Sequence, residues 1–184
     1  MTILILGIIL WWAAHFFKRL APELRSKLPS GGPDRGIMAV TILGSVLLMI
    51  VGYKWANFTP VYDPPTWAKP VNNLLMVVSV VLFGMAGSKG RLGTKLRHPM
   101  LLGFIVWAVA HLIANGDVAS VVLFGGLGLW GVASIFLINA QEGPWERPEP
   151  GPASGDIKLF AISAVVFIVI GTIHHLIGPS PFGA

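Results

Sequence analysis

Apolar residues along the chain form six long runs, separated by short segments that are polar or rich in proline and glycine. A helix needs about 20 apolar residues, and at least about 17, to cross a hydrocarbon core of ~30 Å. Six runs meet or nearly meet this length: residues 2–17, 37–53, 71–87, 99–114, 118–139 and 157–177. The pattern predicts an all-α fold, a polytopic integral membrane helix bundle with about six transmembrane helices.

The breaks between the runs carry turn-forming residues. They read PSGGP at 29–33, DPP at 63–65, NGD at 115–117 and PEPGP at 148–152. Because Asn-Gly and Gly-Asp favour tight turns, Asp117 is interpreted as a turn residue rather than a proton carrier. No segment of 20–50 residues is repeated, so the chain is predicted to form a single transmembrane domain over residues 1–184.

Glycine is concentrated in the fifth run, at Gly125, Gly126, Gly128 and Gly131. Small residues let helix backbones approach closely in lipid, where no hydrophobic force drives helices together. This surface is expected to pack against other helices of the same chain.

Composition confirms that lipid surrounds most of the chain. Apolar residues make up 54% and charged residues 11% of the sequence, against roughly 25% charged residues in a soluble domain. Mean hydropathy is +0.75. A soluble enzyme and a nucleic-acid partner are excluded, although the net charge is +5.

The distribution of the basic residues predicts how the chain crosses the membrane. Eleven of the 13 Lys and Arg residues lie on one side: ten in the connections after the first, third and fifth runs, and Lys158 at the start of the sixth run. The other two are Lys54 and Lys69. The positive-inside rule places the basic connections in the cytoplasm. We expect a multi-pass protein of the bacterial cytoplasmic (inner) membrane with both termini in the periplasm.

The chain contains no cysteine, so iron–sulfur clusters and covalently attached c-type haem are excluded. Ionisable groups inside a membrane indicate function by default, and the candidates are His15, His98, His111, His174 and His175. His15 and His111 lie deepest, each with a Trp one turn earlier, and a functional role is favoured for both. His98 is undecided, and His174 and His175 are interpreted as interface residues.

Two imidazoles from different helices are the usual protein ligands of a b-type haem. His98 and His111 cannot share one metal, because 13 residues of helix separate them by about 20 Å. The haem propionates would need cations near the membrane surface, and four are available on the cytoplasmic side: Lys18, Arg19, Arg91 and Arg97.

Three segments resemble the NnrU family: LRHPMLLGF at 96–104, WAVAHL at 107–112 and NGD at 115–117, together with His15. The resemblance is specific over residues 95–123, and little similarity is expected beyond residue 139. The family includes the plant and cyanobacterial 15-cis-zeta-carotene isomerase. Its NnrU branch implies a role in denitrification, near nitrite and nitric oxide reduction, with respiratory or nitrogen-oxide reductase proteins as partners.

The isomerase branch implies haem b, with His15 and His111 as the metal ligands. It also implies cofactor-binding roles for His98, Arg97 and Lys18. That branch has a Cys three residues before the second ligand, as an alternative ligand in one redox state. The position is Ala108 here, so the ligand switch is lost, and this departure from the family pattern puts carotene isomerisation in doubt.

Helix depth leaves the ligand pair open. By the predicted topology His15 lies near the cytoplasm and His111 near the outer surface, about 15 Å apart in depth, which is too far for one iron. The family pair requires longer or deeper helices than the hydropathy pattern gives. The alternatives are His15 with His98, or His111 with His174 or His175.

Two other functions remain open, and whether the protein is an enzyme is undecided. RHPM at 97–100 followed by LLGF is similar to the motif of membrane methyltransferases of the isoprenylcysteine type, which use S-adenosylmethionine. Those enzymes carry a later acidic and aromatic helix, whereas residues 144–152 here contain four prolines and cannot form a continuous helix. A non-catalytic subunit of a respiratory complex is the third possibility.

Overall fold

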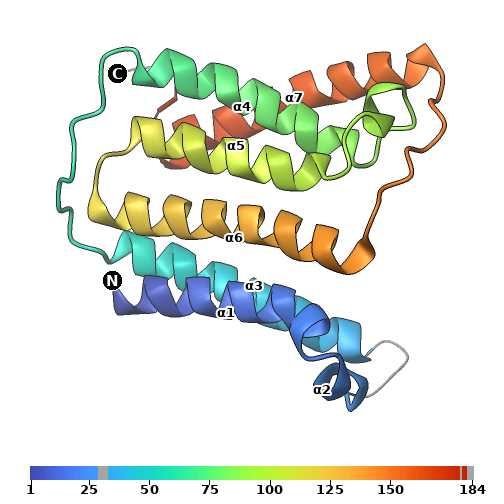
Figure 1. Ribbon diagram of the computed structural model, residues 1–184. Helices are drawn as coiled ribbons and strands as arrows, with labels where there is room; N and C mark the ends of the chain where they lie inside the picture. Colours follow the sequence, from blue (N-terminus) through green and yellow to red (C-terminus); the bar gives the residue numbers. More distant parts are fainter. Residues whose placement is uncertain (29–32, 179, 182–184) are drawn as a thin grey trace. The chain divides into compact units, whose positions relative to one another are not determined.

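The computed structural model describes residues 1–28, 33–178 and 180–181, and in this part of the chain all regular elements are helical (Figure 1). The helices are α1 (Thr2–Leu20), α2 (Pro22–Ser26), α3 (Pro33–Lys54), α4 (Ala68–Met85), η1 (Leu92–Thr94), α5 (Pro99–Ala114), α6 (Val118–Glu142) and α7 (Ala153–Ile177). The expected break at 29–33 lies, apart from Pro33, outside the described residues.

Each of the six predicted runs corresponds to one helix, which confirms the predicted membrane helix bundle. Among the described residues, five helices are long and apolar enough to cross a membrane, and α5 is apolar with 16 residues. The short helices α2 and η1 were not predicted, because they lie in polar connections. Helices α3, α6 and α7 extend into polar residues beyond the predicted bounds, since hydropathy marks the apolar part of a helix and not its ends.

The described chain divides into two compact units. The first contains residues 1–62 and 117–127, and the second contains residues 63–116 and 128–184. Helix α6 therefore begins in the first unit and continues in the second. The single domain expected from the sequence stays a prediction.

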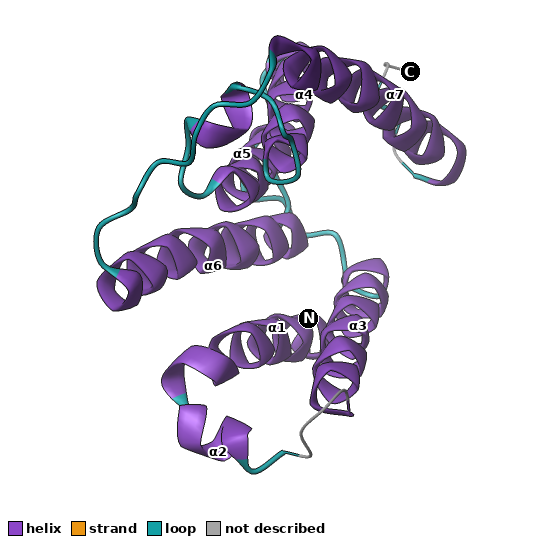
Figure 2. Ribbon diagram, turned by 90° about the vertical axis from the view of Figure 1, so that its right-hand side faces the viewer, coloured by secondary structure: helices purple, strands orange, loops and turns teal. Residues whose placement is uncertain are grey.

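In the first unit, α1 packs against α3, and the two helices meet near the N-terminus of the chain (Figure 2). Two glycines lie in this contact. A Cβ atom on Gly7 would lie 2.8 Å from the backbone nitrogen of Met49, and one on Gly52 would overlap the backbone of Leu4. Such close approach of two backbones is a common way for helices to associate in lipid. These two contacts were not predicted.

In the second unit, α4 packs against both α5 and α7. The Oγ of Ser79, a fully buried residue, donates a hydrogen bond to the carbonyl of Gly103 at 2.8 Å. A Cβ on Gly103 would lie 3.0 Å from the carbonyl oxygen of Ser79. A buried hydrogen bond therefore joins α4 to α5 at Gly103, where the absence of a side chain lets the two helices approach closely.

The glycines of α6 serve mainly as contact points within the chain, as expected. A Cβ on Gly126 would lie 3.1 Å from Ile8 in the first unit, and one on Gly131 would lie 2.9 Å from Ile105 in the second. Gly128 likewise faces Ala108. Gly125 differs, because nothing described lies within 4 Å of the Cβ position.

Candidate functional site

His15 and His111 have the same local geometry on two different helices. The ring Nδ1 of His15 donates to the carbonyl of Trp11 at 2.8 Å, and the ring Nδ1 of His111 donates to the carbonyl of Trp107 at 2.8 Å. The indole of the same Trp lies against each imidazole, with ring centroids 4.1 Å apart in the first pair and 5.1 Å in the second. Residues four apart share a helix face, so each Trp contacts its His both through the backbone carbonyl and through the indole ring.

This hydrogen bond determines where each imidazole carries its proton. A carbonyl oxygen only accepts, so Nδ1 bears the hydrogen and the lone pair of the neutral ring lies on Nε2. Metal-binding histidines are oriented in this way, with one ring nitrogen donating to a carbonyl and the other facing the metal. The sequence predicted the Trp neighbours but not the hydrogen bonds.

The expected ligands belong to different units. His15 and Lys18 lie on α1 in the first unit, and Arg97, His98 and His111 lie in the second. The pairing of His15 with His111 on one iron therefore stays a prediction.

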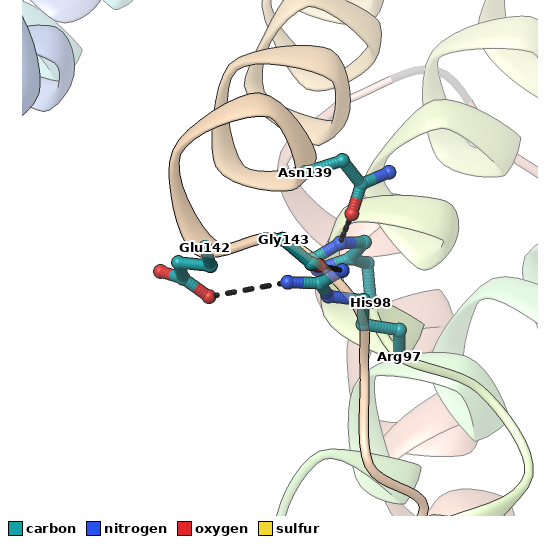
Figure 3. Close-up of polar contacts among 5 residues, drawn as sticks. All are labelled: Arg97, His98, Asn139, Glu142 and Gly143. Carbon is teal, nitrogen blue, oxygen red and sulfur yellow. Dashed lines mark hydrogen bonds and ion pairs between the residues drawn. The ribbon is translucent and has the colours of Figure 1, made fainter.

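Arg97 and His98 tie the start of α5 to the end of α6 (Figure 3). His98 is the N-cap residue of α5, and its Nε2 bonds to Oδ1 of Asn139 at 2.9 Å. Nη1 of Arg97 donates to the carbonyl of Gly143 at 2.6 Å, and Nη2 lies 3.6 Å from the carboxylate of Glu142. His98 therefore forms its hydrogen bond through Nε2, whereas His15 and His111 bond to the Trp carbonyls through Nδ1.

Two further hydrogen bonds join the α4–α5 connection to the segment between α6 and α7 and to the first turn of α7. Nε of Arg147 donates to the carbonyl of Thr94 at 2.9 Å. The backbone N–H of Leu92 donates to Oδ1 of Asp156 at 3.0 Å. The connection between α4 and α5 therefore contacts the connection between α6 and α7.

At the opposite end of this unit, His111 and His174 line one cavity of about 50 Å³. Asn72 and Asn73 contribute to the same lining. Nδ1 of His174 also donates to a backbone carbonyl one turn earlier, that of Ile170, at 3.0 Å. Of the ligand pairs left open by the sequence, His111 and His174 are the two that the structure brings to one cavity.

The two asparagines were missed in the sequence. They stand at adjacent positions at the start of an apolar run, and this placement was the available signal. His174 was interpreted only as an interface residue. His175 does not line the cavity, and its Nδ1 lies 3.0 Å from the hydroxyl of Ser180.

Asp117 accepts two buried hydrogen bonds from Ser120 in the first unit. Its Oδ1 accepts from the backbone N–H of Ser120 at 3.0 Å, and its Oδ2 accepts from the Ser120 hydroxyl. The carboxylate therefore caps the first turn of α6. Burial and this nearby carboxylate raise the pKa of the Tyr62 phenol above its usual value.

Comparison with protein families assigns the chain. The model of the family described as NnrU protein matches residues 3–181. The match continues through α7, so the expectation of little similarity beyond residue 139 was wrong. Comparisons with curated proteins and with solved structures each find no match. A family match over nearly the whole length identifies this membrane helix bundle as a member of the NnrU family.

Proposed function

We propose that this NnrU-family membrane protein binds a b-type haem through His15 and His111. We further propose a redox or accessory role linked to the reduction of nitrite and nitric oxide. One observation supports the ligand assignment above others, namely the repeated geometry in which a Trp carbonyl and indole hold each imidazole. His98 lacks this geometry.

The residues of this chain would act by binding and orienting the group. A bound haem would supply one-electron chemistry. The Trp11 and Trp107 carbonyls would leave Nε2 of each imidazole as the ligating nitrogen and would fix the orientation of each ring. Lys18 and Arg97 are the proposed partners of the propionates. Arg97 already lies beside one carboxylate, that of Glu142, at 3.6 Å.

Absorbance spectra of the purified protein, oxidised and reduced with dithionite after expression with ample haem, test the proposal. The sharp reduced bands of a six-coordinate b-type haem are expected. His15→Ala and His111→Ala should each abolish this signature. His98→Ala is the matched control and should retain it, because the His98 ring is engaged with Asn139.

Three outcomes would overturn the proposal or its ligand pair. A featureless spectrum of folded protein excludes haem binding, and full haem retention in His111→Ala excludes that ligand. Loss of haem in His174→Ala but not in His15→Ala would replace His15 by His174 as the second ligand.

The alternatives predict different results from the same preparation. Folded, haem-free protein that binds S-adenosylmethionine would favour a membrane methyltransferase. Haem-free protein that copurifies with respiratory proteins would favour a non-catalytic subunit.

A further inference from the structure

An apolar groove of about 590 Å³ runs along α1 in the first unit. Its lining is formed by one face of α1 and by a single glycine of α6: Ile8, Ile9, Trp12, Ala13, Phe16, Phe17, Leu20, Ala21 and Gly126. His15 and Lys18 are not among the lining residues. The groove is therefore distinct from the site of the proposed function.

The groove has fixed walls. Nε1 of Trp12 donates to the carbonyl of Gly126 at 3.1 Å, which joins α1 to α6. The ring of Phe16 meets that of Trp12 edge to face, with centroids 5.5 Å apart. Gly126 forms the floor, where a Cβ would come within 3.1 Å of Ile8. The hollow therefore depends on the missing side chain at this position.

The length of the groove matches one lipid chain. The lining extends along α1 from Ile8 to Ala21, and 13 residues of helix rise by about 20 Å. One leaflet supplies about half of a hydrocarbon core of ~30 Å. A single acyl chain along α1 would fit this span.

One end of the groove is basic. It ends at Ala21, where α1 stops and the chain turns into α2. Residues 19–28 around this turn contain three cations and one acidic residue, namely Arg19, Arg25, Lys27 and Glu23. A phosphate at this end would be attracted by the net positive charge.

We propose that this groove binds one acyl chain of an anionic phospholipid, whose phosphate lies among the cations of the α1–α2 turn. The apolar walls hold the chain, and Arg25 and Lys27 select a headgroup with net negative charge. The inference goes beyond the haem site, since neither cation is assigned to it.

Native mass spectrometry of the protein released from vesicles of equal parts phosphatidylglycerol and phosphatidylcholine tests this proposal. The wild-type protein should retain several-fold more phosphatidylglycerol than phosphatidylcholine. Exchange of both cations in Arg25→Gln/Lys27→Gln should bring this ratio close to one. The corresponding Lys54→Gln/Lys69→Gln variant, which changes cations outside this turn, should leave the ratio unchanged.

Substitutions at two adjacent glycines distinguish binding in the groove from attraction by the cations alone. Gly126→Leu fills the floor and should lower the retention of both lipids, whereas Gly125→Leu projects where nothing described lies within 4 Å and should not. Equal retention of the two lipids by the wild-type protein would overturn the proposal. Unchanged retention in a folded Gly126→Leu variant would also overturn it. The haem spectrum, measured in parallel, reports on the proposed function independently.

Discussion

The hydroxyl of Tyr53, in the last turn of α3, lies 2.8 Å from the hydroxyl of Ser120 in the first turn of α6. The direction of this bond follows from its neighbour. Ser120 has one hydroxyl hydrogen and gives it to Asp117, so Tyr53 must donate to Ser120. The chain from Tyr53 through Ser120 to Asp117 joins α3 to the cap of α6.

Two substitutions in this hydrogen-bonded series should lower the free energy of unfolding by different amounts. Tyr53→Phe removes a single donor and should cost about 1 kcal/mol. Ser120→Ala leaves both Tyr53 and a buried carboxylate oxygen without their partner and should cost roughly 1–3 kcal/mol. Thermal unfolding in detergent would measure both, and a larger loss in Tyr53→Phe would contradict the inferred direction.

Tyr62 should ionise at a higher pH than an ordinary tyrosine. Because burial and the Asp117 carboxylate disfavour the phenolate, the pKa of Tyr62 is raised. The chain has two tyrosines, so Tyr53→Phe leaves Tyr62 as the only phenol in an absorbance titration. Its midpoint should exceed the usual value of about 10, and Asp117→Asn should lower it. A midpoint unchanged by Asp117→Asn would show that the carboxylate has no influence.

The α4–α5 contact should not tolerate a side chain at Gly103. Gly103→Val places a Cβ 3.0 Å from the carbonyl oxygen of Ser79, and because its two methyl groups need further space, the helices should separate. Gly125→Ala should be neutral or slightly stabilising, because that Cβ meets open space and Ala favours a helix over Gly by roughly 0.5–1 kcal/mol. Unfolding temperatures of the two variants would show whether the contact is as close as described.

Arg97 should hold the end of α6 mainly through the Gly143 carbonyl. Arg97→Ala removes this 2.6 Å hydrogen bond and should increase cleavage of the following segment by chymotrypsin at Trp145. Glu142→Ala removes an ion pair whose carboxylate partner is 51% exposed, and exposed pairs contribute about 0–1 kcal/mol. Equal cleavage in the two variants would assign the restraint to the ion pair instead.

Topology can be tested with single cysteines, because the chain has none of its own. Phe58 is 80% exposed in the connection between α3 and α4, and Lys95 lies in a basic connection. In intact bacterial cells, a thiol reagent that does not cross membranes should label Phe58→Cys but not Lys95→Cys. The reverse pattern would place both termini in the cytoplasm.

The sequence predicted features that depend on local periodicity. The six helices follow from apolar runs, and the face shared by Trp107 and His111 follows from a spacing of four residues. The family resemblance was likewise readable from one short motif around His98 and His111. These features do not depend on how one helix is rotated against another.

Contacts between distant positions could not be predicted in the same way. The backbone contact of Gly52 with Leu4, the cavity shared by Asn72 and His174, and the bond from Tyr53 to Ser120 each depend on helix rotation and separation. Hydropathy does not fix either quantity, because lipid-facing and helix-facing residues of a membrane helix are similarly apolar.

The distance between α1 and α3 depends on the absence of side chains at Gly7 and Gly52. At Gly52 the contact is made by main-chain atoms of Leu4 and Ile3, and at Gly7 by the main chain and side chain of Met49. The large apolar side chains on the outer faces of both helices lie away from these two positions. We therefore expect exchange of those outer residues for other apolar ones to leave the pairing intact. The separation of the two helices is instead set by two hydrogen atoms, one at each glycine, and a single added methyl group would change it.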